Sequence, residues 1–367
     1  MFKFEVLKTD PGTGARTGRI QTPHGAIDTP CFMPVATQAT VKAMTPRALE
    51  EIGAQVLIVN AYHMYLRPGV QRVRELGGLH EFMGWSGPLV TDSGGFQALS
   101  LAKVSEVAKD GIMFQSHLDG TKYKLTPEGS IDIQEALGAD IMMCLDECPP
   151  FPSTREYMEK SARLTVSWAR RCREVRVSRD KALFGIVQGG VYEDLREESA
   201  RDLEGMGFDG YAIGGLGIGE SKEQRLRATG TAVQYLPDGK PRYLMGVGLP
   251  EDIARAAALG MDMFDCVIPT RNARNGTLFT NHGKVVIKNA RYADDSGPVD
   301  EDCGCYTCSA FSKAYLRHLY LAGEILASIL MTMHNLYFYS QLMTGIRESI
   351  FRGDFSGFKS MTGASGA

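Results

Sequence analysis

The sequence predicts an α/β fold and, within that class, a (β/α)8 barrel. Short apolar runs, typical of strands buried on both faces, alternate with helix-forming segments along a chain of 367 residues. One junction recurs, in which a glycine suited to capping a helix precedes an acidic or amide residue and a new apolar run; it occurs at Gly53, Gly138, Gly207 and Gly260. Eight strands favour a closed barrel, and a doubly wound open sheet is the alternative.

The predicted strands are the apolar runs themselves. In chain order they are Cys31–Val35, Gln55–Asn60, Leu89–Asp92, Asp140–Leu145, Leu183–Gln188, Tyr211–Gly214, Arg242–Met245 and Asp262–Val267. Helices are expected between most of them. Thr45-Pro46 and Thr126-Pro127 each pair an N-cap side chain with proline at the first helical position. Ser153-Thr-Arg-Glu156 predicts a capping box before a long amphipathic helix.

Composition excludes several classes of protein. With 40 basic and 43 acidic residues the formal charge is −3, so nucleic acid could bind only through a local basic patch. Eight cysteines in this length do not form a disulfide scaffold and indicate a reducing compartment. Met1–Asp10 has no signal-peptide core, and the apolar stretch Leu319–Met333 is too short to cross a bilayer. We expect a cytoplasmic protein without membrane association, with a frayed tail over Gly353–Ala367.

Polar residues and glycines gather where the predicted strands end. They are Asn60, Asp92, Asp146, Glu147, Gln188, Gly214, Gly215, Gly246 and Asp265. A barrel brings the carboxyl ends of its strands to one mouth, where active sites lie. A single aspartate after a strand is most often a helix N-cap, but three carboxylate positions with a glutamine and paired glycines favour a functional site.

Paired glycines follow three of the strands. They lie in Asp92-Ser-Gly-Gly-Phe-Gln97, in Gln188-Gly-Gly190 and in Gly214-Gly-Leu216. Each pair alone fits a tight turn, whereas together they predict a slot of backbone amides for a flat polar ligand such as a nucleobase. None of them matches a Walker loop or a dinucleotide-binding fingerprint.

A cysteine cluster near the end of the chain predicts a metal site. Its members are Cys303, Cys305, Cys308 and His334. Zinc takes four thiolate or imidazole ligands in a tetrahedron, so the four predict one structural Zn²⁺ with no open position. His334 lies on a predicted helix over Leu319–Gln341, and His318 is the competing ligand. Buried free cysteines are the alternative interpretation.

Five basic residues and no acidic residue occupy residues 271–291. They are Arg271, Arg274, Lys284, Lys288 and Arg291. A solvated charged face explains them equally well. Because Arg271 and Arg274 follow closely after Asp265, however, phosphate contacts beside a carboxylate-bearing mouth suggest a polyanionic substrate.

Taken together, these motifs resemble the bacterial tRNA-guanine transglycosylases, or queuine tRNA-ribosyltransferases. The segments concerned are Asn60-Ala-Tyr-His63, Leu66-Arg-Pro-Gly69, Asp92-Ser-Gly-Gly-Phe-Gln97, Asp146-Glu-Cys148, Gly214-Gly-Leu216, Phe264-Asp-Cys-Val-Ile-Pro-Thr-Arg-Asn-Ala-Arg274 and the cysteine–histidine set. The resemblance implies one (β/α)8 catalytic domain over residues 1–367, with a zinc-binding subdomain inserted at about residues 280–335.

The resemblance also implies an activity, which belongs to queuosine biosynthesis. Guanine at the anticodon wobble position would be exchanged for 7-aminomethyl-7-deazaguanine, in the tRNAs for aspartate, asparagine, histidine and tyrosine. The enzyme would be a homodimer that binds the anticodon stem-loop, and the exchange would need no redox cofactor. A retaining exchange of this kind proceeds through a covalent enzyme–ribose intermediate.

The resemblance implies roles for individual residues. Asp265 would be the nucleophile and Asp92 the general acid/base. Asp146 would accept hydrogen bonds from the guanine N1–H and 2-amino groups, while Gln188 and the Gly215 N–H stabilise O6. The other implied substrate contacts are Ser93, Gly94, Gly95, Phe96, Cys148, Gly214, Leu216 and Met245. The implied RNA contacts are Gly246, Val247, Gly248, Leu249, Pro250, Glu251, Asp252, Thr270, Arg271, Asn272, Ala273 and Arg274.

Three positions bear on specificity. Cys148 and Ile218 would fill the pocket near the 7-substituent, which suits an aminomethyl group better than the cyclopentenediol of queuine. Leu249 stands where some family members carry a polar or basic residue.

Two other classes compete with this interpretation. A glycosidase or lyase would explain the carboxylates but not the basic run, and a zinc-containing RNA-binding module would explain the reverse.

Overall fold

The main sheet is a closed parallel barrel in the computed structural model, which describes residues 1–102 and 104–361. Its strands are β4 (Cys31–Met33), β5 (Val35–Ala36), β6 (Leu57–Val59), β7 (Leu89–Thr91), β11 (Ile141–Met143), β12 (Ala182–Val187), β13 (Gly210–Ile213), β14 (Arg242–Leu244) and β15 (Met263–Asp265). Only Pro34 separates β4 from β5. Because β4 pairs with β15 and β5 pairs with β6, the sheet closes on itself. The predicted barrel is confirmed, and each of the predicted strands has its counterpart.

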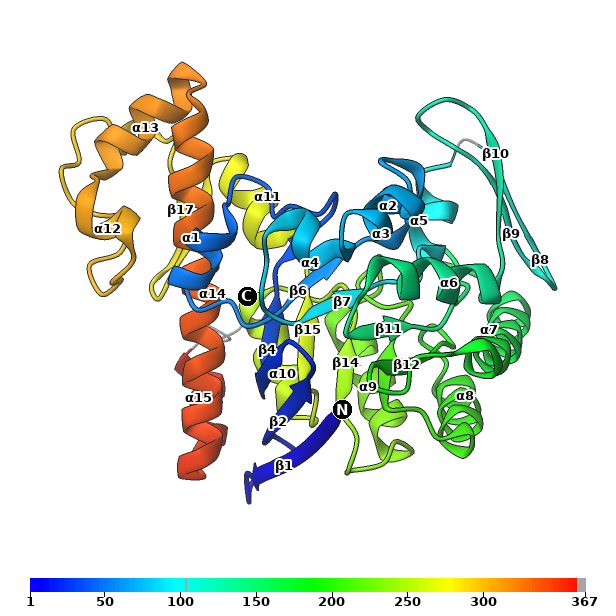
Figure 1. Ribbon diagram of the computed structural model, residues 1–367. Helices are drawn as coiled ribbons and strands as arrows, with labels where there is room; N and C mark the ends of the chain where they lie inside the picture. The colour runs from blue at the N-terminus through cyan, green and yellow to red at the C-terminus, as the bar shows by residue number, and fades with distance from the viewer. Residues whose placement is uncertain (103, 362–367) are drawn as a thin grey trace.

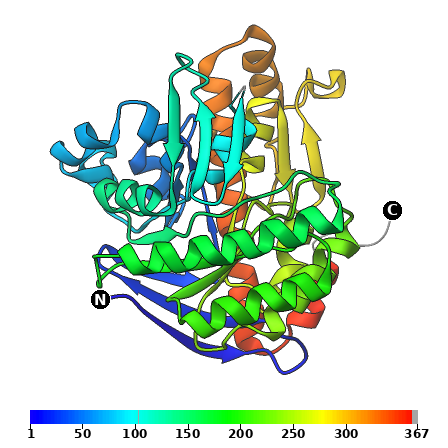
Figure 2. The ribbon, with the colours of Figure 1, turned by 90° about the vertical axis from the view of Figure 1, so that its right-hand side faces the viewer.

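Helices cover the outside of the barrel (Figures 1 and 2). The longer ones are α6 (Pro127–Leu137), α7 (Arg155–Val175), α8 (Glu193–Met206), α9 (Lys222–Gln234), α10 (Pro250–Ala257) and α14 (Ile325–Arg352). The shorter ones beside the early strands are α1 (Pro46–Glu51), α2 (Ala61–Leu66), α3 (Val70–Glu75), α4 (Gly78–Met83) and α5 (Gly95–Ser100). The predicted caps at Thr45 and Thr126 are confirmed, because each side chain accepts a backbone N–H of the first turn.

The predicted start of α7 is wrong by one residue. Thr154, rather than Ser153, accepts the backbone N–H of Tyr157 and caps the helix. The Ser153 hydroxyl instead donates to the carbonyl oxygen of Pro150. Adjacent Ser and Thr are nearly equivalent as caps, so the pattern alone could not choose between them.

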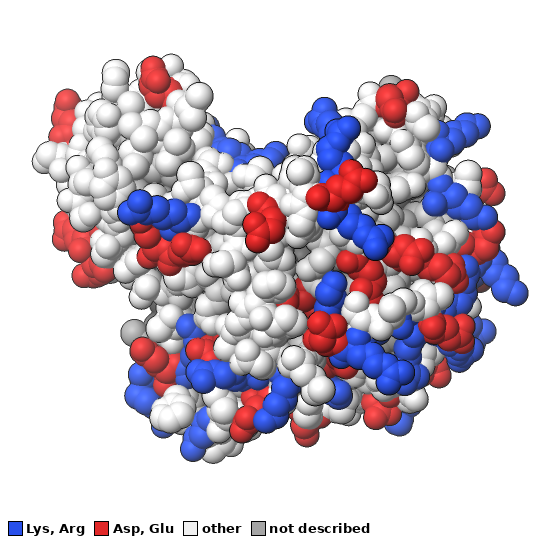
Figure 3. All heavy atoms as spheres, in the orientation of Figure 1, with Lys and Arg blue, Asp and Glu red and all other residues white. Residues whose placement is uncertain are grey.

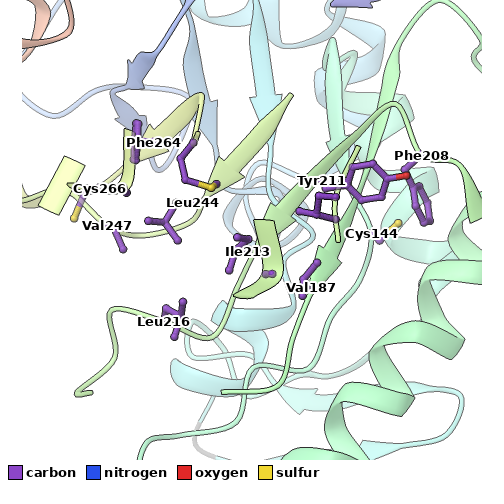
Figure 4. Close-up of a cluster of buried hydrophobic side chains, with 14 of the residues drawn as sticks. Cys144, Val187, Phe208, Tyr211, Ile213, Leu216, Leu244, Val247, Phe264 and Cys266 are labelled. Carbon is purple, nitrogen blue, oxygen red and sulfur yellow. The ribbon is translucent and has the colours of Figure 1, made fainter. Parts of the chain in front are cut away.

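Side chains alternate between the inside and the outside of the barrel. Met33, Ile58, Met143 and Ile186 point inward and form one buried cluster with Ile20 and Ile27, which close its lower end; these last two come from β2 (Arg16–Thr22) and β3 (Gly25–Thr29). A second cluster packs against the helices and includes Val187, Ile213, Leu244 and Phe264 (Figure 4). The alternation leaves the carboxyl ends of the strands free to carry polar groups.

Two insertions project on the mouth side of the barrel (Figure 1). One is the antiparallel sheet of β8 (Ser105–Ala108), β9 (Gly111–Gln115) and β10 (Lys122–Leu125). The other follows α11 (Ile268–Arg274) and contains β16 (Thr277–Thr280), β17 (Gly283–Val286), α12 (Tyr306–Ala310) and α13 (Lys313–Ala322). At the opposite end, β2 and β3 join β1 (Lys3–Thr9) in a separate antiparallel sheet.

Two expectations about the C-terminal region are corrected. The segment Leu319–Gln341 is not one helix, because Gly323 adopts a left-handed φ of 73° and separates α13 from α14. The segment from Gly353 is not frayed throughout, because Phe355–Met361 forms α15 and Phe355 is fully buried. The rest of the expected tail, residues 362–367, lies outside the described residues. Within the described part of the chain, no helix is long and apolar enough to cross a membrane.

Candidate active site

Four strands bring the predicted polar side chains to the mouth of the barrel. Asp92 follows β7, Asp146 is the third residue after β11, Gln188 follows β12 and Asp265 ends β15. All except Asp265, which is half-buried, are buried. Burial raises the pKa of the three carboxyl groups, since it disfavours their charged form.

Asp92 is held by four hydrogen-bond donors. Its Oδ1 accepts the backbone N–H groups of Ala61 at 2.8 Å and Gly94 at 3.2 Å. Its Oδ2 accepts the side-chain amide of Gln97 at 2.9 Å and that of Asn60. Burial nevertheless raises the pKa of Asp92 to about 6, and the nearby Asp265 charge acts in the same direction. A carboxyl group with this pKa can both donate and accept a proton near neutral pH.

Asp265 is held on one oxygen only. Its Oδ1 accepts the Tyr243 hydroxyl at 2.6 Å and the Gly246 backbone N–H at 2.8 Å. Among the described residues, no hydrogen-bond donor reaches its Oδ2. Burial raises the pKa of Asp265, against these two hydrogen bonds. One oriented carboxylate oxygen therefore stays free to react at the mouth.

Asp146 forms the centre of a second polar group. Its Oδ2 accepts the Gln188 amide at 2.7 Å, and its Oδ1 accepts the Ser93 hydroxyl at 3.2 Å. Burial raises the pKa of Asp146 to about 6, while both hydrogen bonds lower it. The Gln188 Oε1 atom is buried without a partner among the described residues. An unpaired buried acceptor beside a carboxylate is suited to a ligand that supplies N–H groups.

Gly214 and Gly215 lie against this group. A Cβ atom on Gly215 would stand 2.3 Å from the Gln188 Oε1 atom, and its φ of 68° also disfavours a side chain. A Cβ atom on Gly214 would stand 2.8 Å from the Gln188 amide nitrogen. The Gly215 backbone N–H faces the thiol of Cys148. Glycine at both positions therefore lets backbone approach the slot closely.

The remaining implied substrate contacts differ in exposure. Phe96 is 47% exposed beside the glycine pair Gly94-Gly95, so its ring is open to stacking on a flat ligand. Leu216 is buried, and Met245 is half-buried. Aromatic and apolar walls beside the polar groups are typical of a nucleobase pocket.

The implied RNA contacts are only partly accessible. Gly246 and Arg271 are exposed, and Leu249, Glu251, Asn272 and Arg274 are half-buried. Those with buried side chains or backbone are Val247, Gly248, Pro250, Asp252, Thr270 and Ala273. Residues buried in this way can shape the protein surface from beneath, but their side chains are not exposed for contact with RNA.

The basic residues after Asp265 stand without acidic partners. In residues 1–102 and 104–361, no ion pair within 4.0 Å involves Arg271, Arg274, Lys284, Lys288 or Arg291. Burial lowers the pKa of Arg274, and the neighbouring Arg271 charge adds to this. Figure 3 shows a saddle between the two projecting insertions, with basic side chains on its walls. Unpaired cations beside a hollow are suited to phosphate groups.

The cysteine cluster is assembled around one imidazole nitrogen. His334 Nδ1 lies 3.7, 3.5 and 3.3 Å from the sulfur atoms of Cys303, Cys305 and Cys308. Edges of about 3.4–3.8 Å are those of a tetrahedron around zinc. His334 Nε2 lies 2.7 Å from the Phe279 carbonyl oxygen, which fixes Nδ1 as the ligand atom. The cluster could therefore hold a metal ion, and its ligand set is consistent with zinc.

Sequence reasoning missed two residues that shape the site. Tyr243 is a buried strand residue whose hydroxyl orients Asp265. Arg196 is fully buried on α8 and donates to the carbonyl oxygens of Val187 and Gly190, both at 2.8 Å, which holds the turn that carries Gln188. Burial lowers the pKa of Arg196 to about 10. No local motif marks either residue.

Comparisons with known proteins agree on one family. A family model described as Queuine tRNA-ribosyltransferase matches residues 10–365. A protein of that name from a Thermoanaerobacter species is 53% identical over 358 residues, covering 97% of this chain and 96% of the relative. A protein of the same name from Syntrophobacter fumaroxidans is 53% identical, covering 95% of this chain and 93% of the relative. One from Listeria monocytogenes is 51% identical, covering 97% of this chain and 94% of the relative.

Proposed function

The chain belongs to the queuine tRNA-ribosyltransferase family and is a pentosyltransferase, and from this premise we propose the reaction and the residues that carry it. The enzyme exchanges guanine at the anticodon wobble position for 7-aminomethyl-7-deazaguanine, in the tRNAs for aspartate, asparagine, histidine and tyrosine. The observation that supports this most directly is the convergence of Asp92, Asp146 and Asp265 on one mouth, each with different hydrogen-bond partners.

Asp265 attacks the ribose. Its free Oδ2 forms a bond to the anomeric carbon as the bond to guanine breaks, and the charge that develops on the ribose is stabilised by the carboxylate. The entering base then displaces the carboxylate from the other side, so the configuration of the ribose is retained. Tyr243 and Gly246 hold Oδ1 and thereby direct Oδ2 toward the substrate.

Asp92 and the Asp146 group handle the base. Asp92 gives a proton to the departing guanine and takes one from the entering base. Asp146 accepts the base's N1–H and 2-amino groups, while the Gly215 N–H and the second N–H of the Gln188 amide, whose first N–H contacts Asp146, stabilise the oxygen at position 6. Phe96 stacks on the ring, and Cys148 and Ile218 restrict the space for the 7-substituent. The wobble nucleotide is taken out of its stack to reach this slot.

Incorporation of labelled 7-aminomethyl-7-deazaguanine into tRNA tests the proposed function. Label should enter a transcript with guanine at the wobble position and not one with adenine there. A glycosidase would release guanine without incorporating label, and an RNA-binding module would do neither. Either of these results would overturn the proposal.

Arg271 and Arg274 are expected to contact phosphates of the anticodon loop. Changing both to Gln should raise the Kd for tRNA and flatten its dependence on salt. Each lost phosphate contact should lower the slope of log Kd against log salt by about 0.7–0.9. Filter binding at several salt concentrations measures this.

Arg201→Gln is the matched control for that experiment. Arg201 is an exposed arginine on α8, paired with Glu197 and stacked on Tyr235. Its removal should change neither the Kd nor the slope. If the double variant keeps the wild-type slope, the RNA binds on another face of the protein.

Zinc is expected at the cysteine cluster in a structural role. Four protein ligands leave no position for substrate, so the ion would organise the insertion rather than take part in the exchange. Cys305→Ala should lose the metal, lower the Tm and weaken tRNA binding, while the barrel remains folded. Metal analysis should find about one zinc per chain in the wild type and almost none in the variant.

The two candidate histidines give that prediction its control. His334 lies in the cluster, whereas His318 is an exposed residue on α13 outside it. His334→Ala should lose zinc and His318→Ala should keep it. The opposite pattern would show that the ligand set is wrong.

We also propose that the enzyme is a homodimer. Large apolar side chains are exposed on the second insertion and the start of α14; they are Tyr306, Tyr315, Leu321, Ile325 and Leu326. An exposed apolar surface of this kind is typical of a protein–protein interface. Light scattering of the purified protein measures the assembly directly.

A further inference from the structure

The loop between β5 and α1, residues 37–45, has an unusual backbone conformation. Ala39 has a φ of 55° and Ala43 a φ of 65°, and within residues 1–102 and 104–361 they are the two residues other than glycine with positive φ. A residue with a Cβ atom is strained in the left-handed region, and such strain is kept mostly where a function needs it. The loop follows a barrel strand on the mouth side, and no part of the proposed reaction uses it.

This loop forms one wall of a hollow of about 380 Å³, which we call the Lys42 pocket. Its polar lining residues are Thr37, Gln38, Thr40, Lys42, His63 and His117. The first four belong to the loop, His63 belongs to α2, and His117 lies in the turn between β9 and β10. Three segments that are distant in the sequence therefore build one pocket.

The lining of the Lys42 pocket is rich in hydrogen-bond donors and contains no carboxylate. Across the described part of the chain, no ion pair within 4.0 Å involves Lys42, His63 or His117. Burial lowers the pKa of His63, and the charges of His117 and Lys42 act in the same direction. The three groups therefore lie close enough to disfavour one another's positive charge, and a bound anion would relieve this repulsion.

The two imidazoles leave nitrogen atoms available to a ligand. His117 Nδ1 lies 2.9 Å from the hydroxyl oxygen of Tyr62, a buried residue whose ring stacks on the imidazole, so Nε2 is the nitrogen that remains. The His63 ring is nearly perpendicular to that of His117, with planes inclined by 87° and centroids 5.8 Å apart. Its nitrogens form no hydrogen bond with any described residue. An imidazole donates an N–H in either protonation state.

The Lys42 pocket lies beside the candidate active site. His63 is the third residue after Asn60, whose side-chain amide donates to Asp92 Oδ2. Leu101, which also lines the pocket, directly follows α5, and Gln97 on that helix donates to the same oxygen at 2.9 Å. Four helical residues span about 6 Å along the axis. A nucleotide next to the one in the slot can therefore reach the pocket.

We propose that the Lys42 pocket binds a backbone phosphate of the anticodon loop next to the wobble nucleotide, an inference that rests on the proposed function. Lysine, threonine and glutamine side chains are among the groups that most often contact nucleic-acid phosphates. The pocket combines α2, the first insertion and the strained loop, whereas Arg271 and Arg274 belong to α11. The two sites would contact different phosphates and together keep the wobble nucleotide out of its stack.

A double-mutant cycle between the protein and the RNA backbone tests the proposal. Anticodon stem-loops are made with a single uncharged methylphosphonate linkage, placed at each position of the loop in turn, and filter binding gives the Kd for each. Lys42→Gln should weaken binding of the unmodified stem-loop by about threefold to tenfold. One uncharged linkage next to the wobble nucleotide should weaken wild-type binding by a similar factor and have almost no further effect on Lys42→Gln. A merely structural role of Lys42 would leave the effect of every linkage unchanged.

Lys8→Gln is the matched control, since Lys8 is an exposed lysine on β1, at the end of the barrel opposite the mouth. It should bind every stem-loop as the wild type does. Incorporation of labelled base by the wild type is measured on the same stem-loops. Incorporation without any coupling between Lys42 and a loop linkage would overturn the phosphate site alone, whereas loss of both incorporation and binding would overturn the proposed function as well.

Light scattering of Lys42→Gln covers the competing explanation, in which the loop contacts a second copy of the chain. The variant should keep the oligomeric state of the wild type. Dissociation of the assembly, with no coupling at any linkage, would place the loop in an interface between subunits and overturn the phosphate site.

Discussion

Asp265→Asn is expected to abolish the covalent RNA–enzyme adduct and to lower guanine exchange by about 10⁴-fold or more. The substitution keeps the size of the side chain but replaces a carboxylate by a neutral amide, which neither attacks the ribose nor leaves it afterwards. Denaturing electrophoresis of enzyme incubated with a labelled anticodon stem-loop measures the adduct. The variant should still bind the stem-loop, because Asp265 supplies no positive charge to the RNA surface.

The same substitution is expected to leave the fold intact or to stabilise it. Burial raises the pKa of Asp265 in the folded state, so the carboxyl contributes most to stability at low pH and loses that contribution as pH rises through the folded pKa. At a pH above the raised pKa, the ionised group is therefore a cost to folding that asparagine avoids. The Asn oxygen can still accept from Tyr243 and Gly246.

Thermal melting separates this outcome from simple misfolding. A Tm at pH 7 equal to or above that of the wild type, together with the loss of the adduct, would support the nucleophile. A denaturation-resistant adduct formed by the Asn variant would assign the attack to another residue. A large fall in Tm would mean that the charge is stabilised in the fold, contrary to the raised pKa.

The barrel could be predicted because its determinants are local. Each strand is a short apolar run, and the four glycines of the recurring junction all have positive φ, from 70° at Gly207 to 92° at Gly260. Gly323 also has a positive φ, of 73°, and a glycine inside an apolar helical segment is the signal that predicts the break between α13 and α14. Serine and threonine have similar N-cap preferences, so the sequence could not decide between Ser153 and Thr154.

The active site could be predicted only in part. The carboxyl ends of the strands predict that Asp92, Asp146, Gln188 and Asp265 lie at one mouth, because parallel strands in a barrel bring those ends together. The pKa values of the three aspartates depend on burial and on the hydrogen-bond donors around them, and both follow from packing in the folded chain. Tyr243 pairs with Met263 on the neighbouring strand, and its hydroxyl reaches Asp265, two residues further along that strand.

The Lys42 pocket shows the limit of sequence reasoning most clearly. The cysteine cluster can be recognised from the sequence because three of its four members lie within six residues. The Lys42 pocket combines a loop after one strand, a short helix and a turn of the first insertion, which only the folded chain brings together. No spacing rule relates residues whose proximity depends on the whole fold.

Asp92→Asn is expected to slow guanine exchange by about 10²–10⁴-fold while leaving tRNA binding nearly unchanged. Asp92 is 8% exposed and follows β7, whereas Arg271 and Arg274 belong to α11, so the substitution leaves the proposed phosphate contacts in place. In the proposed reaction Asp92 carries a proton from the entering to the departing base, and an amide cannot do this. Single-turnover measurements of adduct formation and adduct breakdown separate the two half-reactions.

The pH dependence of those half-reactions identifies Asp92 as the group concerned. The pKa of Asp92 is raised to about 6. Adduct formation uses the protonated acid and should slow as pH rises through that value, whereas breakdown uses the carboxylate and should accelerate. Both slopes should vanish in Asp92→Asn. Asp146 has a similar pKa of about 6, but Asp146→Asn should raise the KM for the free base and keep both slopes. If the slopes persist in Asp92→Asn and disappear in Asp146→Asn, the proton is carried by Asp146 instead.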